Sequence, residues 1–291
     1  MSPLLRWMSG RSLAFLHALG ALLGWLTYAA SPSYRRRLRA NAALAGLTAA
    51  QRRAAVAEAG RLVAELPRLW LRPRSQPIAD PVRWEGAELV EALLAQGRGL
   101  VLLTPHLGSF EVAAQAYAER FGARQPLTVL YRPARQAWLR ELEATARARP
   151  ALSTAPATLA GVRQMMRALK RGETLGLLPD QVPPEGMGVW APFFGQPAYT
   201  MTLASRLVQQ TGAAVAVLCC ERLARGAGYV VRALPLPEAL PARQPGEDEA
   251  AAQRAAAASL NRSMETVVRS LPTQYLWGYH RYKQPRLAEG G

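Results

Sequence analysis

Short apolar segments alternate with longer helical segments through most of this 291-residue sequence. The strand-like segments are 100–103, 128–131, 174–178, 213–220 and 228–236. The helical segments around them are 87–96, 109–121, 136–149, 159–170, 200–210 and 249–271. Strands that alternate with helices pack as a central sheet with helices on its faces. We therefore predict an α/β fold with a central mixed sheet flanked by helices.

An 18-residue apolar run, Leu13–Ala30, precedes this region and contains no formally charged residue at neutral pH. It is just long enough to cross the ~30 Å hydrocarbon core of a bilayer, so we predict an N-terminal hydrophobic anchor helix. Arginines flank the run on both sides: Arg6 and Arg11 before it, and Arg35, Arg36, Arg37 and Arg39 after it. The heavier flank follows, which keeps the rest of the chain cytoplasmic and disfavours a cleaved signal peptide. His17 and two glycines weaken a spanning helix, so an interfacial anchor and a buried core helix remain alternatives.

Three regions follow from this pattern: an N-terminal membrane anchor helix at 1–33, a helical lead-in at 34–75 and an α/β domain at 76–291. The lead-in is rich in alanine, arginine and leucine and carries helical signals at 34–45 and 48–70. Half of all residues are apolar, which is enough to bury one substantial core in one main domain.

The net charge is +16, from 36 Lys and Arg against 20 Asp and Glu. Such a charge indicates anionic partners: nucleic acid, acidic lipid headgroups or an acidic carrier protein. The two cysteines, Cys219 and Cys220, are adjacent within an apolar run, so we expect buried thiols rather than a disulfide. No ligand cluster implies a metal or a redox cofactor.

A candidate catalytic pair lies where the strand-like segment 100–103 ends. His106 follows this segment, Glu111 comes five residues later, and a helix is expected to begin near Ser109. A chain reversal at Gly108 would bring the carboxylate to the imidazole. A carboxylate on one ring nitrogen fixes the tautomer and leaves the other nitrogen to take a proton from a hydroxyl. The spacing alone is a weak signal, because a histidine at a strand end is more often structural.

Five motifs, taken in order, are far more specific. They are Thr104-Pro-His-Leu-Gly-Ser-Phe-Glu111, Tyr131-Arg132-Pro133, Leu178-Pro-Asp-Gln181, Pro192-Phe-Phe-Gly195 with Pro197 and Thr200, and Tyr275-Leu-Trp277 with His280-Arg281. In order and spacing, over nearly the entire chain, the sequence resembles the lipid A biosynthesis (lauroyl/myristoyl) acyltransferase family. Ser109 stands where the family often has Asn, and Phe110 stands where it often has Trp.

The resemblance implies a glycerolipid acyltransferase-like fold and a defined reaction. A fatty acyl group would pass from an acyl carrier protein thioester to a hydroxyl of a lipid A precursor, an anionic lipid, on the inner leaflet of the cytoplasmic membrane. By the family pattern His106 is the general base and Glu111 its orienting partner.

The resemblance also implies a set of substrate-binding residues. Arg132 and Arg147 match family arginines near the site, with Arg149 as a competitor for the place of Arg147, and Asp180 with Gln181 matches a family Asp-Gln element. We infer that the arginines bind phosphate or polarise the thioester carbonyl, because a planar guanidinium suits oxyanions. Asp180 is expected to organise the site by positioning an arginine or a substrate hydroxyl.

Two alternatives remain open. The same residues would serve another membrane acceptor, such as a phosphoinositol mannoside, an ornithine lipid or a lysophospholipid. The charge also permits a nucleic-acid-binding protein, but the arginines are dispersed, no recognised nucleic-acid module is present and an anchor has no use there, so we expect no nucleic-acid partner. For the tail around His280 we expect a C-terminal strand packed on the sheet.

Overall fold

The computed structural model describes residues 3–131, 136, 140, 142–143, 146–242 and 246–287. The helices are α1 (Pro3–Ser9), α2 (Leu13–Ala30), α3 (Pro32–Leu44), α4 (Ala49–Trp70), α5 (Ala87–Ala95), α6 (Phe110–Phe121), α8 (Leu159–Lys170), α9 (Leu203–Thr211) and α10 (Glu249–Ser270). The strands are β1 (Val82–Glu85), β2 (Leu100–Leu103), β3 (Leu127–Tyr131), β4 (Leu152–Pro156), β5 (Thr174–Leu177), β6 (Gly188–Phe193), β7 (Gln196–Met201), β8 (Ala214–Arg222) and β9 (Tyr229–Pro235).

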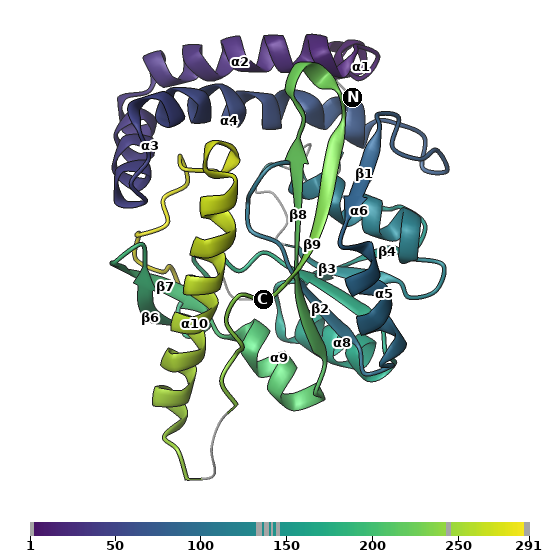
Figure 1. Cartoon of the computed structure of the whole chain (residues 1–291), viewed down its shortest axis with the longest axis vertical. Helices are drawn as coiled ribbons and strands as arrows, with labels where there is room; N and C mark the ends of the chain where they lie inside the picture. The colour runs from purple at the N-terminus through teal and green to yellow at the C-terminus, as the bar shows by residue number, and fades with distance from the viewer. Residues whose placement is uncertain are drawn as a thin grey trace.

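Seven of these strands form the central sheet, in the order β1-β9-β8-β2-β5-β3-β4 (Figure 1). All neighbouring pairs are parallel except β8 and β9, which are antiparallel. The sheet is therefore mixed and has helices on both faces, which confirms the predicted α/β fold.

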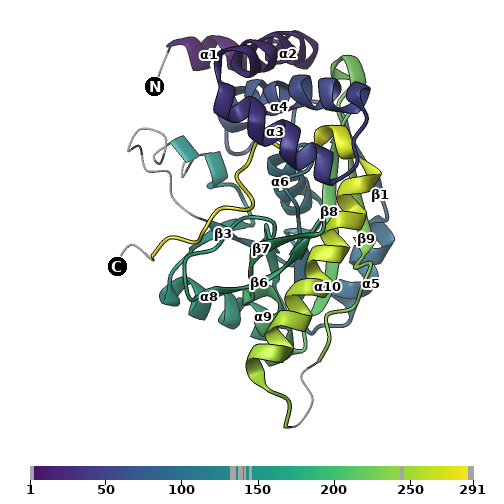
Figure 2. The same ribbon diagram turned by 90° about the vertical axis from the view of Figure 1, so that its left-hand side faces the viewer.

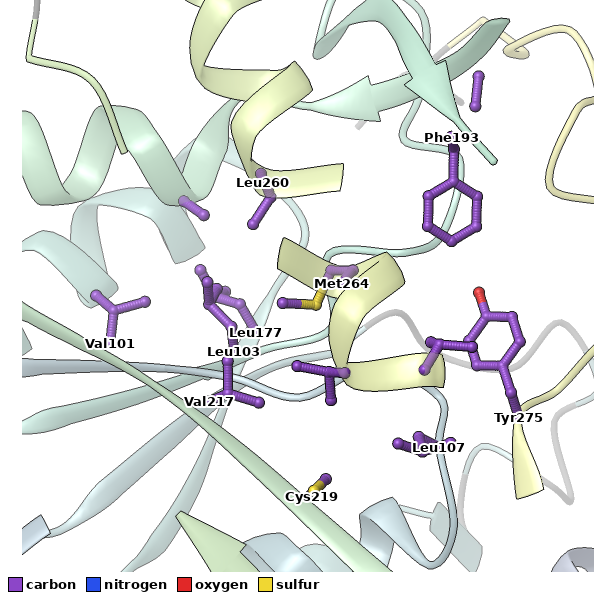
Figure 3. Packing of buried hydrophobic residues seen from close by; sticks show 14 of the residues in the cluster. Val101, Leu103, Leu107, Leu177, Phe193, Val217, Cys219, Leu260, Met264 and Tyr275 are labelled. Carbon is purple, nitrogen blue, oxygen red and sulfur yellow. The ribbon is translucent and has the colours of Figure 1, made fainter. Parts of the chain in front are cut away.

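Both faces of the sheet are buried, because alternate residues of each central strand enter different cores. Val101 and Leu103 of β2 join a core that includes residues of α8, α9 and α10. Leu100 and Leu102 join the opposite core, under α5 and α6. Figure 3 shows the first core, to which both Leu103 and Met264 of α10 belong. A strand buried on both sides explains the unbroken apolar run of β2.

A two-stranded hairpin, β6–β7, stands apart from the central sheet. The sequence predicted a helix from residue 200, but residues 196–201 form β7 and the helix α9 begins only at Leu203. The two-residue loop, Phe194-Gly195, has positive φ at both positions, as a tight hairpin turn requires. Pro192 and Pro197 are register partners in this hairpin. Because proline argues against a strand in a sequence, neither strand was predicted.

The prediction of a C-terminal strand around His280 is wrong, because residues 278–283 form turns and bends. Arg281 is buried there and donates to the Tyr199 carbonyl (2.7 Å) and to Thr200 Oγ1 (2.8 Å). The tail thus contacts β7 through the Arg281 side chain rather than through a strand ladder.

Strand β4 was not predicted from the sequence, and the predicted helix 136–149 lies partly outside the described residues.

Helix α2 lies along α4 across the top of the molecule (Figures 1 and 2). Three glycines make this approach close: a Cβ on Gly60 of α4 would come within 1.9 Å of the Gly20 carbonyl oxygen and 2.7 Å of the Gly24 nitrogen. Of the described helices, α2 alone is long and apolar enough to cross a membrane by length and composition. The division at 33/34 between anchor and lead-in stays a prediction.

Substituting Gly60 by alanine should destabilise the protein. Alanine is preferred over glycine in a helix by about 1 kcal/mol, but here its methyl group meets backbone atoms that cannot rotate away, and such overpacking costs about 1–3 kcal/mol. We expect Gly60→Ala to lower the free energy of unfolding, measured by denaturant titration. Gly10→Ala is a control for the loss of a glycine without a clash: Gly10 lies in the turn after α1, and the nearest atom to its added Cβ would be 3.7 Å away. A Gly60→Ala protein as stable as the wild type would show that the two helices are free to move apart.

Candidate active site

Two adjacent parallel strands, β2 and β5, end in the same way. Their register pairs Leu103 with Leu177, and each strand continues through one residue and a proline to a polar residue, His106 or Asp180. Proline keeps the residue before it extended, so both segments continue in the strand direction. Three residues beyond the last pair, His106 and Asp180 therefore meet at the carboxyl edge of the sheet.

The His106–Asp180 pair is joined by two hydrogen bonds. Nδ1 of the imidazole lies 2.7 Å from one carboxylate oxygen, and the backbone N–H of His106 donates to the other oxygen at 2.9 Å. The exposed fractions of the two side chains are 10% and 2%. Burial alone would raise the pKa of Asp180, but the charge of His106 and these hydrogen bonds outweigh it and lower the pKa. In the neutral form of the imidazole, the ionised Asp180 accepts a hydrogen bond from Nδ1–H, so the other ring nitrogen, Nε2, carries the lone pair.

Gln181 contacts that second ring nitrogen. Its amide nitrogen, Nε2, lies 2.8 Å from His106 Nε2, so with the proton on Nδ1 the amide donates to the imidazole lone pair. Phe110 packs edge-on against the same imidazole, with ring centroids 4.8 Å apart. The imidazole is therefore held by Asp180 and Phe110, and its Nε2 is covered by the Gln181 amide.

The segment 274–276 supports the turn that carries His106. The His106 carbonyl accepts from the Leu276 N–H at 3.1 Å, and the Gly108 N–H donates to the Gln274 carbonyl at 3.0 Å. Gly108 has a φ of +60°, and a Cβ there would come within 1.9 Å of the Cys220 carbonyl oxygen, so only glycine fits. Tyr275 lies beside Leu107 at this junction (Figure 3). Burial and the charge of Asp180 raise the pKa of Tyr275 well above its usual value.

Glu111 binds Arg147, and not the imidazole. Its carboxylate pairs with the Arg147 guanidinium, whose charge lies over the rings of Tyr131 (4.9 Å) and Trp70 (5.9 Å). Burial opposes the charge of Arg147, but Glu111 and Glu143 raise its pKa. The orienting partner expected from the sequence is thus corrected: the helix turns the Glu111 side chain toward Arg147, while Asp180 occupies His106 Nδ1. A catalytic part for Glu111 stays a prediction.

Comparison with known proteins identifies the family. The profile of the bacterial lipid A biosynthesis acyltransferases matches residues 9–284. This chain belongs to that family. It is 29% identical over 205 residues to the lipid A biosynthesis lauroyltransferase of Escherichia coli (strain K12), covering 69% of this chain and 62% of the relative. It is 26% identical over 231 residues to the E. coli lipid A biosynthesis palmitoleoyltransferase and to a Shigella flexneri lipid A biosynthesis acyltransferase, covering 79% of this chain and 70% of each.

The structure separates two of the three arginines that the family resemblance placed near the site, Arg147 and Arg149. Arg147 is at Glu111. Arg149 is buried, and its donors reach carbonyls at the end of α4 and beyond it: those of Leu69, Trp70, Arg72 and Pro73, together with that of Ala146. Burial lowers the pKa of Arg149 to about 10. Arg149 thus satisfies a helix terminus, a structural task. Arg132 lies outside the described residues.

The pairing of His106 with Asp180 can be checked without an enzyme assay. The proton between Nδ1 and the carboxylate should give a downfield NMR resonance, because it is buried and shared with a charged acceptor. We expect Asp180→Asn to remove or strongly shift this resonance and Glu111→Gln to leave it nearly in place. The reverse pattern would restore Glu111 as the partner of the imidazole.

Proposed function

We propose that this protein transfers a fatty acyl chain from an acyl carrier protein thioester to a hydroxyl of a lipid A precursor. The observation that carries the proposal is the buried imidazole of His106, with a carboxylate on Nδ1 and a donor amide in place of a substrate on Nε2. Membership of the lipid A acyltransferase family supplies the substrate class. No metal or redox cofactor takes part in this scheme.

The chemistry needs one base and one orienting carboxylate. The acceptor hydroxyl oxygen bonds to the thioester carbonyl carbon while His106 Nε2 takes its proton, and Asp180 stabilises the imidazolium that forms. The tetrahedral intermediate then collapses, the carbon–sulfur bond breaks, and the imidazolium gives its proton to the leaving thiolate. The products are an ester and a free carrier thiol, and no enzyme nucleophile is required.

Gln181 has two tasks in this scheme. Its amide covers Nε2 before substrate binds, and the acceptor hydroxyl takes its place there. The displaced amide remains beside the reacting carbonyl and donates to the oxyanion that forms. A neutral donor to the oxyanion contributes on the order of 10²–10³ in rate.

Arg147 and Arg132 are proposed to meet substrate anions, with Glu111 holding Arg147 in place. Nη1 of Arg147 is buried and has no hydrogen-bond acceptor among the described residues, although Glu143 lies 3.8 Å away. Its guanidinium therefore keeps one donor for an acceptor phosphate or a thioester oxygen. Arg132 lies outside the described residues, and its part in the proposal rests on the family resemblance alone.

His106→Ala and Asp180→Asn should each lower kcat by on the order of 10²–10⁴, because the first removes the base and the second removes the charge that stabilises the imidazolium. The assay uses an acyl carrier protein thioester and a lipid A precursor. Glu173→Gln is the control, since this carboxylate pairs with an exposed arginine on the surface.

Glu111→Gln separates the two carboxylates. We expect it to act mainly on KM, because it loosens an arginine proposed to bind substrate. Full activity of His106→Ala would end the assignment, and an inactive Glu111→Gln beside an active Asp180→Asn would return the orienting role to Glu111.

We further propose that α1 and α2 lie on the cytoplasmic surface of the inner membrane. Large apolar side chains are exposed along both helices: Leu4, Trp7, Phe15, Leu22, Leu23, Trp25 and Leu26. Exposed patches of this kind mark a protein or membrane contact. The flanking arginines suit anionic headgroups, each contributing on the order of 1 kcal/mol.

An interfacial position fits the packing better than a spanning one. Helix α2 runs along α4, which carries charged residues over its length, among them Arg53, Glu58 and Arg61. A spanning α2 would either draw these charges into the hydrocarbon core, at a cost of several kcal/mol, or break its glycine contacts with α4. When α2 lies flat, it buries its exposed face in lipid, keeps its glycine contacts with α4 and leaves the charges of α4 outside the hydrocarbon core.

The double substitution Leu22→Glu with Leu26→Glu should release the protein from anionic vesicles, with at least a ~10-fold loss of partitioning, because two exposed leucines no longer enter lipid. Leu159→Glu is the control: this leucine is also exposed, but it lies on α8, which packs on the sheet below α1 and α2 (Figures 1 and 2). Vesicle sedimentation measures both. Retention of the double variant would place the membrane contact elsewhere.

A further inference from the structure

Ser109 departs from the usual chemistry of its position. It is the N-cap of α6, where a serine oxygen ordinarily accepts from the first turn and stabilises the helix by about 1 kcal/mol. Its side chain makes no capping hydrogen bond. Instead the hydroxyl donates to Glu65 Oε1, on α4, at 2.5 Å. A serine at an N-cap that does not cap its helix, between His106 and Glu111, indicates that its hydroxyl serves the site instead.

Glu65 is the meeting point of several elements. Its Oε1 accepts from Ser109 and, at 3.3 Å, from Arg222 at the end of β8. Its Oε2 lies 3.0 Å from His17 Nε2 of α2 and 3.4 Å from the Tyr229 hydroxyl of β9. The exposed fraction of the Glu65 side chain is 1%. A buried carboxylate with four partners is strongly fixed, because each lost partner leaves a buried charge less compensated.

The chain around Ser109 has few other supports on this side. Its backbone N–H donates to the Cys220 carbonyl at 2.7 Å, and Arg222 Nη1 approaches its hydroxyl at 3.2 Å. These contacts come from the end of β8, whereas among the hydrogen bonds of the described residues Glu65 joins Ser109 to the helical layer above. That layer includes α2, the helix that we assign to the membrane surface.

We propose that Glu65 is a positioning residue for acyl transfer: through Ser109 it holds the His106–Glu111 turn, and through His17 it joins that turn to α2. This inference rests on the proposed function. The turn carries both the base and the carboxylate that holds Arg147, so a displacement of about 1 Å would be felt at both and can cost up to ~10²-fold in rate. The position of α2 on the membrane and the position of His106 in the site are therefore linked through Glu65.

The first arm of the test separates position from charge. Ser109→Ala removes the hydroxyl and keeps the Glu65–Arg222 pair. Glu65→Asp keeps the charge but is one methylene too short to reach both Ser109 and His17. We expect each to lower kcat at least 10-fold with KM changed less than about 2-fold. The double variant should be no slower than the slower single variant, since both substitutions break the same contact, that between Glu65 and Ser109.

The matched control is Glu58→Gln. Glu58 lies on the same helix and binds the same arginine, Arg222, at 3.2 Å, but no hydrogen bond joins it to Ser109 among the described contacts. Its kcat should stay within about 2-fold of wild type. If a general loss of support for Arg222 were the cause, Glu58→Gln would be as slow as Glu65→Asp, and the proposal would be overturned.

The second arm tests the link to α2. His17→Gln places an amide N–H near the position of the imidazole Nε2 and should keep most of the activity, whereas His17→Leu should lower kcat with the vesicle-bound fraction unchanged. Equal activity of the two variants would remove α2 from the connection.

A readout that needs no turnover keeps this proposal separate from the proposed function. The His106 Nδ1–H resonance should shift in Ser109→Ala and Glu65→Asp and stay in place in Glu58→Gln. An unmoved resonance together with wild-type kcat overturns the positioning role. A moved resonance in a protein that transfers no acyl chain, even as wild type, supports the positioning role and overturns the proposed reaction alone.

Discussion

The in-register parallel pairing of β2 with β5 is the constraint on which the site depends. A register fixed by two buried faces cannot slip by one residue, because a slip would turn every side chain to the opposite face. Leu103 beside Leu177 then leaves no freedom for the residues that follow. His106 and Asp180 meet because two strands end together. The register of the sheet brings the two residues together, and the hydrogen bonds then fix their side chains.

Two further segments support the turn at the carboxyl edge of the sheet. Segment 274–276 returns from α10 to bond the backbone at His106 and Gly108, and Glu65 reaches down from α4 to Ser109. Neither contact is close in sequence to His106. The His106–Glu111 turn is thus a short segment whose hydrogen-bonding groups are satisfied mostly by distant partners, which suits a loop that must be rigid without being part of the sheet.

The sequence predicted more of the fold than of the site. Apolar runs identified β2, β5 and β8 because strands buried on both faces need unbroken apolar sequence. Prolines hid the β6–β7 hairpin. For the site, spacing along the chain suggested Glu111 as the partner of His106, whereas the partner is 74 residues away. The signal was present in Leu-Thr-Pro-His and Leu-Leu-Pro-Asp, two strand ends of one pattern, but its use requires knowing that β2 and β5 are neighbours. The separate tasks of Arg147 and Arg149 depend on side-chain direction, which composition and periodicity do not carry.

The contact between His17 and Glu65 spans 48 residues, and this separation matters during synthesis. At roughly 5–20 residues per second, α2 leaves the ribosome about 2–10 s before the carboxylate that it will meet. For that interval the apolar helix lacks the completed α4, the helix that it packs against, and we expect such a nascent segment to be covered by lipid or by a chaperone. We expect attachment to precede docking: the helix reaches the bilayer first, and α4 then folds down onto a helix already in place.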